Sequence, residues 1–102
     1  MQDMDAATRA FSMARDANAQ LYAPDEFRIA GQHLDQAQEA EARENFTAAV
    51  RFARQSVVDS DLAIARARLG KARESVEQLQ QENVNLNRDL NGNGRSSPEA
   101  QP

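Results

Sequence analysis

Residues 62–90 read LAIARARLGKARESVEQLQQENVNLNRDL, and they carry the most regular pattern in the 102-residue chain. Apolar positions recur there at alternating spacings of three and four residues, which is the heptad repeat of a helix that packs along one face against another helix. A lone helix would leave its leucines in water, so the pattern predicts a partner helix from this chain or from another. We call the nine positions of this repeat the heptad seam: Leu62, Ala65, Leu69, Ala72, Val76, Leu79, Asn83, Leu86 and Leu90.

Two shorter helical segments precede this stretch. The first is predicted at about residues 3–22 and the second at about residues 25–43, because alanines and larger apolar residues recur in both at helical spacing. Pro24 disfavours helical geometry at the residue before it and suits the first turn of a new helix, so a kink is expected there. Asn45 tolerates the left-handed conformation that ends helices, and it is expected to close the second segment before a long helix at residues 46–90.

The prediction is therefore an all-α fold, with two arrangements open. In the first, a long antiparallel helical hairpin kinked at Pro24, the two shorter segments stack end to end against residues 46–90. Paired residue numbers then sum to about 90, which brings Leu34 near Val57, Ala14 near Val76 and Met4 near Leu86. In the second, a three-helix bundle is followed by a protruding coiled coil, and Asn83 at an a position favours a parallel dimer. We favour the hairpin because its arms match in length and because Arg68 would face Arg73 of the second copy in the dimer.

The composition limits the chain to one small domain. Hydrophobic residues make up 40% of the chain, but 19 of them are alanines, and the mean hydropathy is −0.77. An enclosed core that could surround a substrate is not expected from so few large apolar side chains. Residues 1–90 are predicted to form the helical domain, and residues 91–102 have the composition of a disordered tail. No apolar run is long enough for a membrane span or a signal peptide.

Charge is distributed unevenly along the chain, although the net charge is only −4. Residues 1–45 are acidic and residues 46–73 are basic, so attraction between the two segments is expected to help pair them. Four bases form a short cluster that is a candidate contact for an anionic surface: Arg66, Arg68, Lys71 and Arg73. The cluster lacks interleaved aromatic residues and lies in a chain of pI about 4.9, so nucleic-acid binding is not predicted.

No catalytic, cofactor-binding or metal-binding residue is predicted. The one histidine, His33, has no other metal-binding side chain at helical spacing and is expected at the edge of the core or in solvent. The chain has no cysteine and no glycine-rich phosphate loop. Four aromatic residues are candidates for hairpin packing or for an interaction patch, and the three phenylalanines among them are expected to plug the hairpin end: Tyr22, Phe27, Phe46 and Phe52.

Several motifs resemble those of a known family. They are YAPDEFRIA at residues 22–30, NFTAA at residues 45–49 and ARQSVVDSDLA at residues 53–63, followed by the long last helix. Together they resemble the Ala-rich helical domain of unknown function (DUF4398-like) found in short Gram-negative lipoproteins and ahead of OmpA-like peptidoglycan-binding domains. The resemblance implies a periplasmic outer-membrane lipoprotein, although this chain lacks the signal peptide and the lipid-bearing cysteine of that pattern.

Three functions follow as expectations. The first is a non-enzymatic helical interaction or spacer module of a bacterial envelope lipoprotein, which binds another envelope protein or peptidoglycan through its helix faces. In that case the chain would meet a membrane only through a lipid anchor. The second is a cytosolic coiled-coil protein that self-associates through the heptad seam. The third is a ligand-binding helical bundle, for which the sequence offers no convergent polar residues.

Overall fold

The structure is a computed structural model that describes residues 1–96, with side chains described as far as residue 92. Every regular element in this range is a helix, and residues 1–96 contain no strand. The prediction of an all-α fold is therefore confirmed. The helices are α1 (Gln2–Asp16), α2 (Ala19–Tyr22), α3 (Pro24–Ala42) and α4 (Phe46–Ser96).

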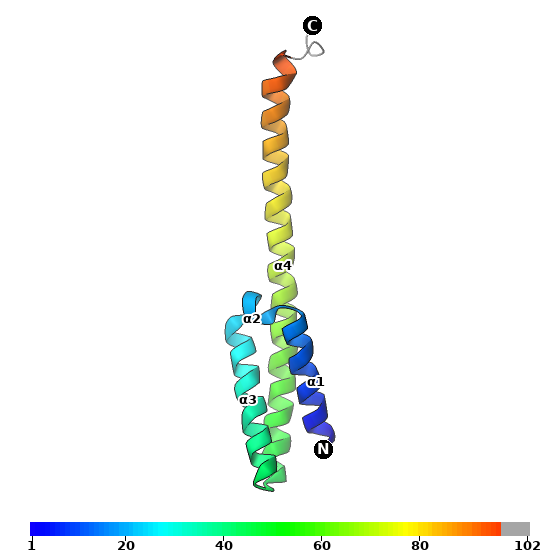
Figure 1. Cartoon of the computed structure of the whole chain (residues 1–102), viewed down its shortest axis with the longest axis vertical. Helices are drawn as coiled ribbons and strands as arrows, with labels where there is room; N and C mark the ends of the chain where they lie inside the picture. The colour runs from blue at the N-terminus through cyan, green and yellow to red at the C-terminus, as the bar shows by residue number, and fades with distance from the viewer. Residues whose placement is uncertain (97–102) are drawn as a thin grey trace. The chain divides into compact units, whose positions relative to one another are not determined.

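The chain divides into two compact units, residues 1–71 and residues 72–102. The first unit contains α1, α2, α3 and the first part of α4 (Figure 1). The second unit contains the remainder of α4.

The chain reverses direction at Asn18, earlier than the sequence predicts. Asn18 lies in the left-handed region, with φ 61° and ψ 35°, and its N–H donates to the carbonyl oxygen of Arg15 at 2.9 Å. An asparagine adopts this conformation at lower cost than most residues, because its short polar side chain forms local hydrogen bonds. The predicted continuous helix at residues 3–22 is therefore wrong: α1 ends at Asp16, and the one-turn helix α2 leads into α3.

The first unit is a three-helix arrangement, and the favoured hairpin is wrong. Met4 of α1 lies in one core cluster with Leu34 of α3 and Ala53 of α4, whereas the hairpin would place Met4 near Leu86. Ala14 lies in a second cluster with Ala63, not near Val76. These neighbours show α1 parallel to α4 and antiparallel to α3, as Figure 1 also shows. The alternative three-helix prediction is the one that matches residues 1–71.

The helices of the first unit approach closely because their buried stripes are made mainly of small residues. Ala7, Ala30 and Ala37 are fully buried on α1 and α3. On α4, the buried stripe contains Ala49, Ala53, Ser56, Ser60, Ala63, Ile64 and Ala67. Small side chains let two helix backbones pack near each other, and burial of many methyl groups replaces the large apolar core that the composition cannot supply.

The turn between α3 and α4 is a Schellman motif centred on Glu44. Glu44 has φ 61°, its N–H donates to Glu41 O at 2.9 Å, and the N–H of Asn45 donates to Ala40 O at 2.8 Å. Asn45 then caps α4, since its side-chain oxygen accepts from the N–H of Ala48 at 3.3 Å. The turn is where the sequence predicts it, but Glu44 takes the left-handed position that we assigned to Asn45.

Helix α4 continues to Ser96, beyond the predicted end at residue 90. The Asn91–Gly94 segment is helical in the structure, so it does not stop the helix as its composition suggests. A continuing helix needs only that these residues accept helical φ and ψ, which glycine and asparagine do at a modest cost. The rest of the predicted tail, residues 97–102, lies outside the described residues.

Candidate functional site

In the first unit, the heptad seam is not the face that α4 buries. Leu62 and Leu69 are 43% and 49% exposed, and Ala65 is exposed as well. The core takes Ala63 and Ala67 instead. Because successive helical residues point about 100° apart, the core and the seam occupy different faces of α4. The core of the first unit is thus complete without the seam.

In the second unit, every residue from 72 to 92 is exposed. Val76 is 51%, Leu79 64%, Leu86 55% and Leu90 59% exposed. We call the seam positions of this unit the C-terminal seam: Ala72, Val76, Leu79, Asn83, Leu86 and Leu90. The valine and the leucines among them are at least half exposed and recur at heptad spacing, so they form an apolar helix face. Within residues 72–92, nothing packs against this face.

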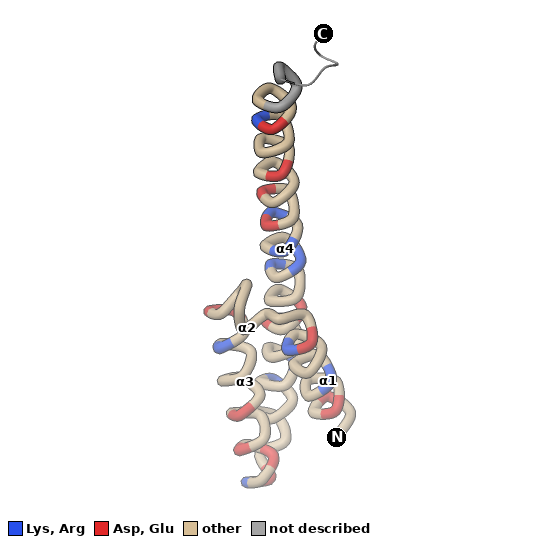
Figure 2. Tube along the Cα trace, turned by 45° about the horizontal axis from the view of Figure 1, so that its top comes forward, with Lys and Arg blue, Asp and Glu red and all other residues tan. Residues whose placement is uncertain are grey.

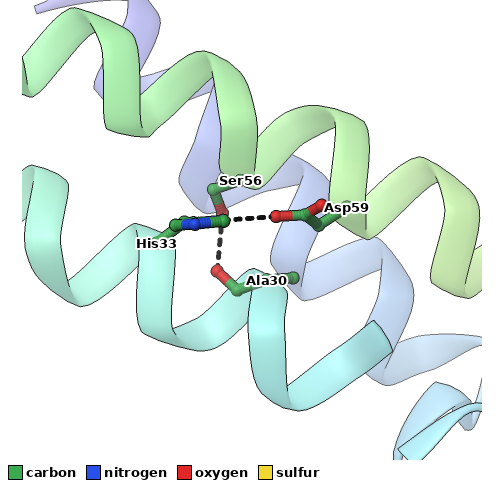
Figure 3. A network of polar contacts seen from close by, with 4 residues as sticks. All are labelled: Ala30, His33, Ser56 and Asp59. Carbon is green, nitrogen blue, oxygen red and sulfur yellow. Dashed lines mark hydrogen bonds and ion pairs between the residues drawn. The ribbon is translucent and has the colours of Figure 1, made fainter. Parts of the chain in front are cut away.

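The polar network between α3 and α4 was not predicted from the sequence. Nδ1 of His33 lies 2.5 Å from a carboxylate oxygen of Asp59, and both side chains are about three-quarters buried (Figure 3). Beside them, the buried hydroxyl of Ser56 donates to the carbonyl oxygen of Ala30 at 2.8 Å. The sequence could have predicted this contact, because residues of α3 and α4 that face each other have numbers that sum to about 90. His33 and Asp59 fit that sum, as do Leu34 and Val57, which share a cluster as predicted.

This network joins α3 to α4. Here the ring of His33 stacks near that of Phe52, at 6.2 Å between centroids. No group of three potential metal ligands occurs among the residues that the structure describes. The contact therefore fits a fixed pairing of α3 with α4.

The three phenylalanines Phe27, Phe46 and Phe52 do not form the predicted plug. Phe27 stacks on Phe11 of α1, at 4.6 Å between ring centroids, and packs against the core cluster that contains Ala14. Phe52 packs against the other cluster, while Phe46 at the turn is 54% exposed. The plug requires a two-armed hairpin, and with three helices α1 supplies the aromatic partner instead. Tyr22 lies against Gly70, where a Cβ would be 3.0 Å from the ring atom Cδ1.

Two of the four basic candidates are engaged within the first unit. Nε of Arg66 lies 3.1 Å from a carboxylate oxygen of Glu26, and Nζ of Lys71 lies 5.8 Å from the centroid of the Tyr22 ring. Arg68 and Arg73 are exposed. Figure 2 shows this basic group on α4, and beyond it along the helix acidic residues outnumber basic ones.

Opposite charges join the acidic and basic segments, as the charge distribution predicts. The Arg66–Glu26 pair links α4 to α3, and Nε of Arg54 lies 3.1 Å from a carboxylate oxygen of Asp3, which links α4 to α1. The arginines are well exposed, so each pair contributes about 0–1 kcal/mol. These contacts therefore help to select which helices pair, but they add little to the stability of the fold.

An open groove of about 520 Å³ lies beside the His33–Asp59 pair, with Val50 and Val58 among its lining residues. Its two arginines already have partners in this chain: Arg54 contacts Asp3, and the guanidinium of Arg51 lies 5.1 Å from the centroid of the Phe52 ring. A small-molecule site needs enclosure and converging polar groups, and this groove is open to solvent. The C-terminal seam is the stronger candidate site.

No helix in residues 1–96 is both long and apolar enough to cross a bilayer. Comparison with curated proteins gave no match, and comparison with solved structures gave none either. One protein family matches residues 2–79, which is most of the chain, and it is described as a domain of unknown function, DUF4398. The match covers all of α1, α2 and α3 and a large part of α4. By that match, the chain belongs to the DUF4398 family.

Proposed function

We propose that this protein is a non-enzymatic helical interaction module that binds another protein helix along the C-terminal seam. The observation that supports this proposal most strongly is the exposure of Val76, Leu79, Leu86 and Leu90 at heptad spacing. The core of the first unit uses other positions of α4, so the seam residues are not part of that core. Leucines on such a face lose their contact with water when a second helix packs there.

A helix suits this face better than a carbohydrate polymer does. The six seam positions include no aromatic ring and only one polar side chain, Asn83. Glycan recognition needs several hydrogen-bonding groups or an aromatic platform, whereas helix pairing needs small and branched apolar side chains at a and d. Protein binding is therefore preferred to peptidoglycan binding for this surface.

A non-enzymatic role agrees with the chemistry of the described residues. His33, the one histidine, is held by Asp59 between two helices, and the open groove beside this pair contains arginines that already have partners. An enzyme would need converging reactive groups in a site that excludes water. The exposed surface of α4 is a better place for function than the space between the helices.

The cellular setting that we propose is the bacterial envelope, where the module would belong to a lipoprotein. This follows from the resemblance of YAPDEFRIA and the later motifs to domains found in such proteins. Metabolic labelling of the native gene product with a fatty acid tests it, with membrane fractionation in parallel. Label and membrane association are expected. A native product that is unlabelled and remains in the cytosolic fraction would instead favour the cytosolic coiled-coil alternative.

Photocrosslinking in the native cell tests binding along the seam. A photoreactive amino acid at Leu79 is expected to give a covalent protein adduct, because Leu79 is the most exposed leucine of the C-terminal seam. The matched control is Gln81, which is exposed two residues further on and lies at the f position, the heptad position farthest from the seam. Equal adduct yields at the two positions would contradict the proposed function.

A further inference from the structure

We infer that the partner of the C-terminal seam is a second copy of this chain, which pairs with it in parallel and in register. This inference rests on the proposed function, because it names the helix that the seam binds. Residues 72–92 supply three heptads of exposed helix, about the shortest length that specifies a coiled coil. We therefore expect a reversible dimer whose population depends on protein concentration.

Asn83 is the residue that selects a second copy. It is the one polar side chain among the six seam positions, and it occupies an a position. In a parallel, in-register dimer it meets Asn83 of the second copy, and the two amides can form a hydrogen bond. A different helix would have to carry a polar group at the same level, whereas two-fold symmetry supplies that group automatically.

Asn83 also disfavours an antiparallel pair. In antiparallel coiled coils an a residue faces a d residue of the other helix, and the d positions of the C-terminal seam are Ala72, Leu79 and Leu86. All three are apolar, so the amide of Asn83 would be buried without a hydrogen-bond partner. That burial costs free energy which the parallel arrangement avoids.

The flanking positions allow the parallel register. Each g residue faces the e residue five positions further along the second copy, which gives the pairs Ser75 with Gln80 and Glu82 with Asn87. Neither pair brings like charges together. By the same spacing Arg73 faces Arg68 of the second copy, and two-fold symmetry makes this repulsive contact twice, which keeps the expected dimer weak.

A charge-sign experiment at Asn87 tests direction as well as partner. Asn87 is exposed, and its helical neighbours at three and four positions are uncharged: Asn83, Val84, Leu90 and Asn91. Asn87→Lys therefore adds no charged contact within its own helix, but in the parallel dimer it places two lysines opposite Glu82 of the other copy. Sedimentation velocity of the full chain should show roughly threefold tighter dimerisation, the size expected of two exposed ion pairs.

The matched variant Asn87→Glu should weaken the dimer by a similar factor, because it places Glu82 opposite a glutamate. In an antiparallel pair the signs reverse, since e positions then face e positions and Asn87→Glu would approach Arg73 of the second copy. A reversal of sign, or equal dimerisation by both variants, would overturn the parallel register.

Cysteine crosslinking checks the register directly, because the chain has no cysteine of its own. Under mild oxidation of the full chain, Leu86→Cys at a d position should form a disulfide-linked dimer, and Gln81→Cys at an f position should not. A chain that stays monomeric, together with no crosslink at residue 86, overturns the inference.

Failure of the inference and failure of the proposed function are distinguishable. If Leu79 photocrosslinks to a protein of another mass, and the purified chain is a monomer, the seam binds a different helix: the proposed function stands and the second copy is excluded. If residues 79 and 81 crosslink equally, the seam is not a binding face and both proposals fall. An adduct of two copies of this chain at residue 79 supports both.

Discussion

His33 of α3 and Asp59 of α4 lie 2.5 Å apart, between Nδ1 and a carboxylate oxygen, in a position where each side chain is about three-quarters buried. This contact joins two helices whose remaining interface consists mainly of small side chains. A partly buried hydrogen bond with a charged acceptor stabilises a fold more than the exposed ion pairs of the same unit do.

Removal of this contact should lower stability. His33→Ala or Asp59→Asn is expected to lower the free energy of unfolding by about 1–2 kcal/mol, measured by urea denaturation followed by circular dichroism. The double variant should lose less than the sum of the two single variants, because the two residues share one interaction. Asp61→Asn is the control, since Asp61 is exposed on the same helix. If Asp61→Asn lowered the free energy of unfolding as much as Asp59→Asn does, the loss would come from removing a negative charge on α4 and not from removing the contact with His33.

Two serines of α4 should respond in opposite directions to the same substitution. Ser56 and Ser60 are both fully buried, but the hydroxyl of Ser56 donates to Ala30 O, whereas the Oγ of Ser60 has no hydrogen-bond partner among the described residues. Ser56→Ala should lower the free energy of unfolding by about 1 kcal/mol, and Ser60→Ala should raise it by a similar amount. Thermal unfolding of the two variants measures both changes. Equal destabilisation would contradict this account of their polar environments.

Gly70 provides space for Tyr22. Gly70→Ala gains helix propensity of about 1 kcal/mol. The new Cβ, however, would lie 3.0 Å from Cδ1 of Tyr22 and 3.4 Å from the Cβ of Tyr22. We expect the clash to exceed the gain and the variant to lose about 1 kcal/mol net. In a Tyr22→Ala background the same substitution should become stabilising, which denaturant titration of all four chains would show. A loss that persists without the Tyr22 ring would exclude steric contact as its cause.

Glu44 occupies a left-handed position that glycine adopts more easily. Glu44→Gly should raise the free energy of unfolding by about 0.5–1 kcal/mol, because φ is 61° at this residue and glycine has no Cβ to clash. Ala42→Gly, two residues earlier within α3, should lower it by about 1 kcal/mol. Urea denaturation distinguishes the two. Destabilisation by Glu44→Gly would show that the Glu44 side chain contributes more than its backbone strain costs.

The fold could be predicted from the sequence where the pattern had one solution. The buried stripe of α3 and its turn into α4 are such cases: Ala30, Leu34, Ala37 and Ala40 recur at helical spacing, and all four are buried. The family resemblance is confirmed by the match over residues 2–79.

The path of α1 could not be predicted, because its stripe fits either of two neighbours. The stripe with Met4, Ala7 and Ala14 could pack against the last part of α4, as in the hairpin, or against α3 and the first part of α4, as in the structure. The choice depends on one left-handed residue, Asn18. On α4 the alanine stripe and the leucine seam lie on different faces, and hydrophobicity alone favours the leucines for the core. The core takes mainly small residues of α4, because small side chains let the helices approach more closely than leucines would.

The central claim is that the C-terminal seam of α4 pairs with the same seam of a second copy of this chain, and sedimentation equilibrium of the purified full chain tests it most directly. We expect a mass that rises with concentration from one copy toward two, a fall to one copy with Leu79→Asp, and no change from wild type with the exposed control Gln81→Asp. A dimer that persists unchanged in the Leu79→Asp variant would contradict pairing through the seam.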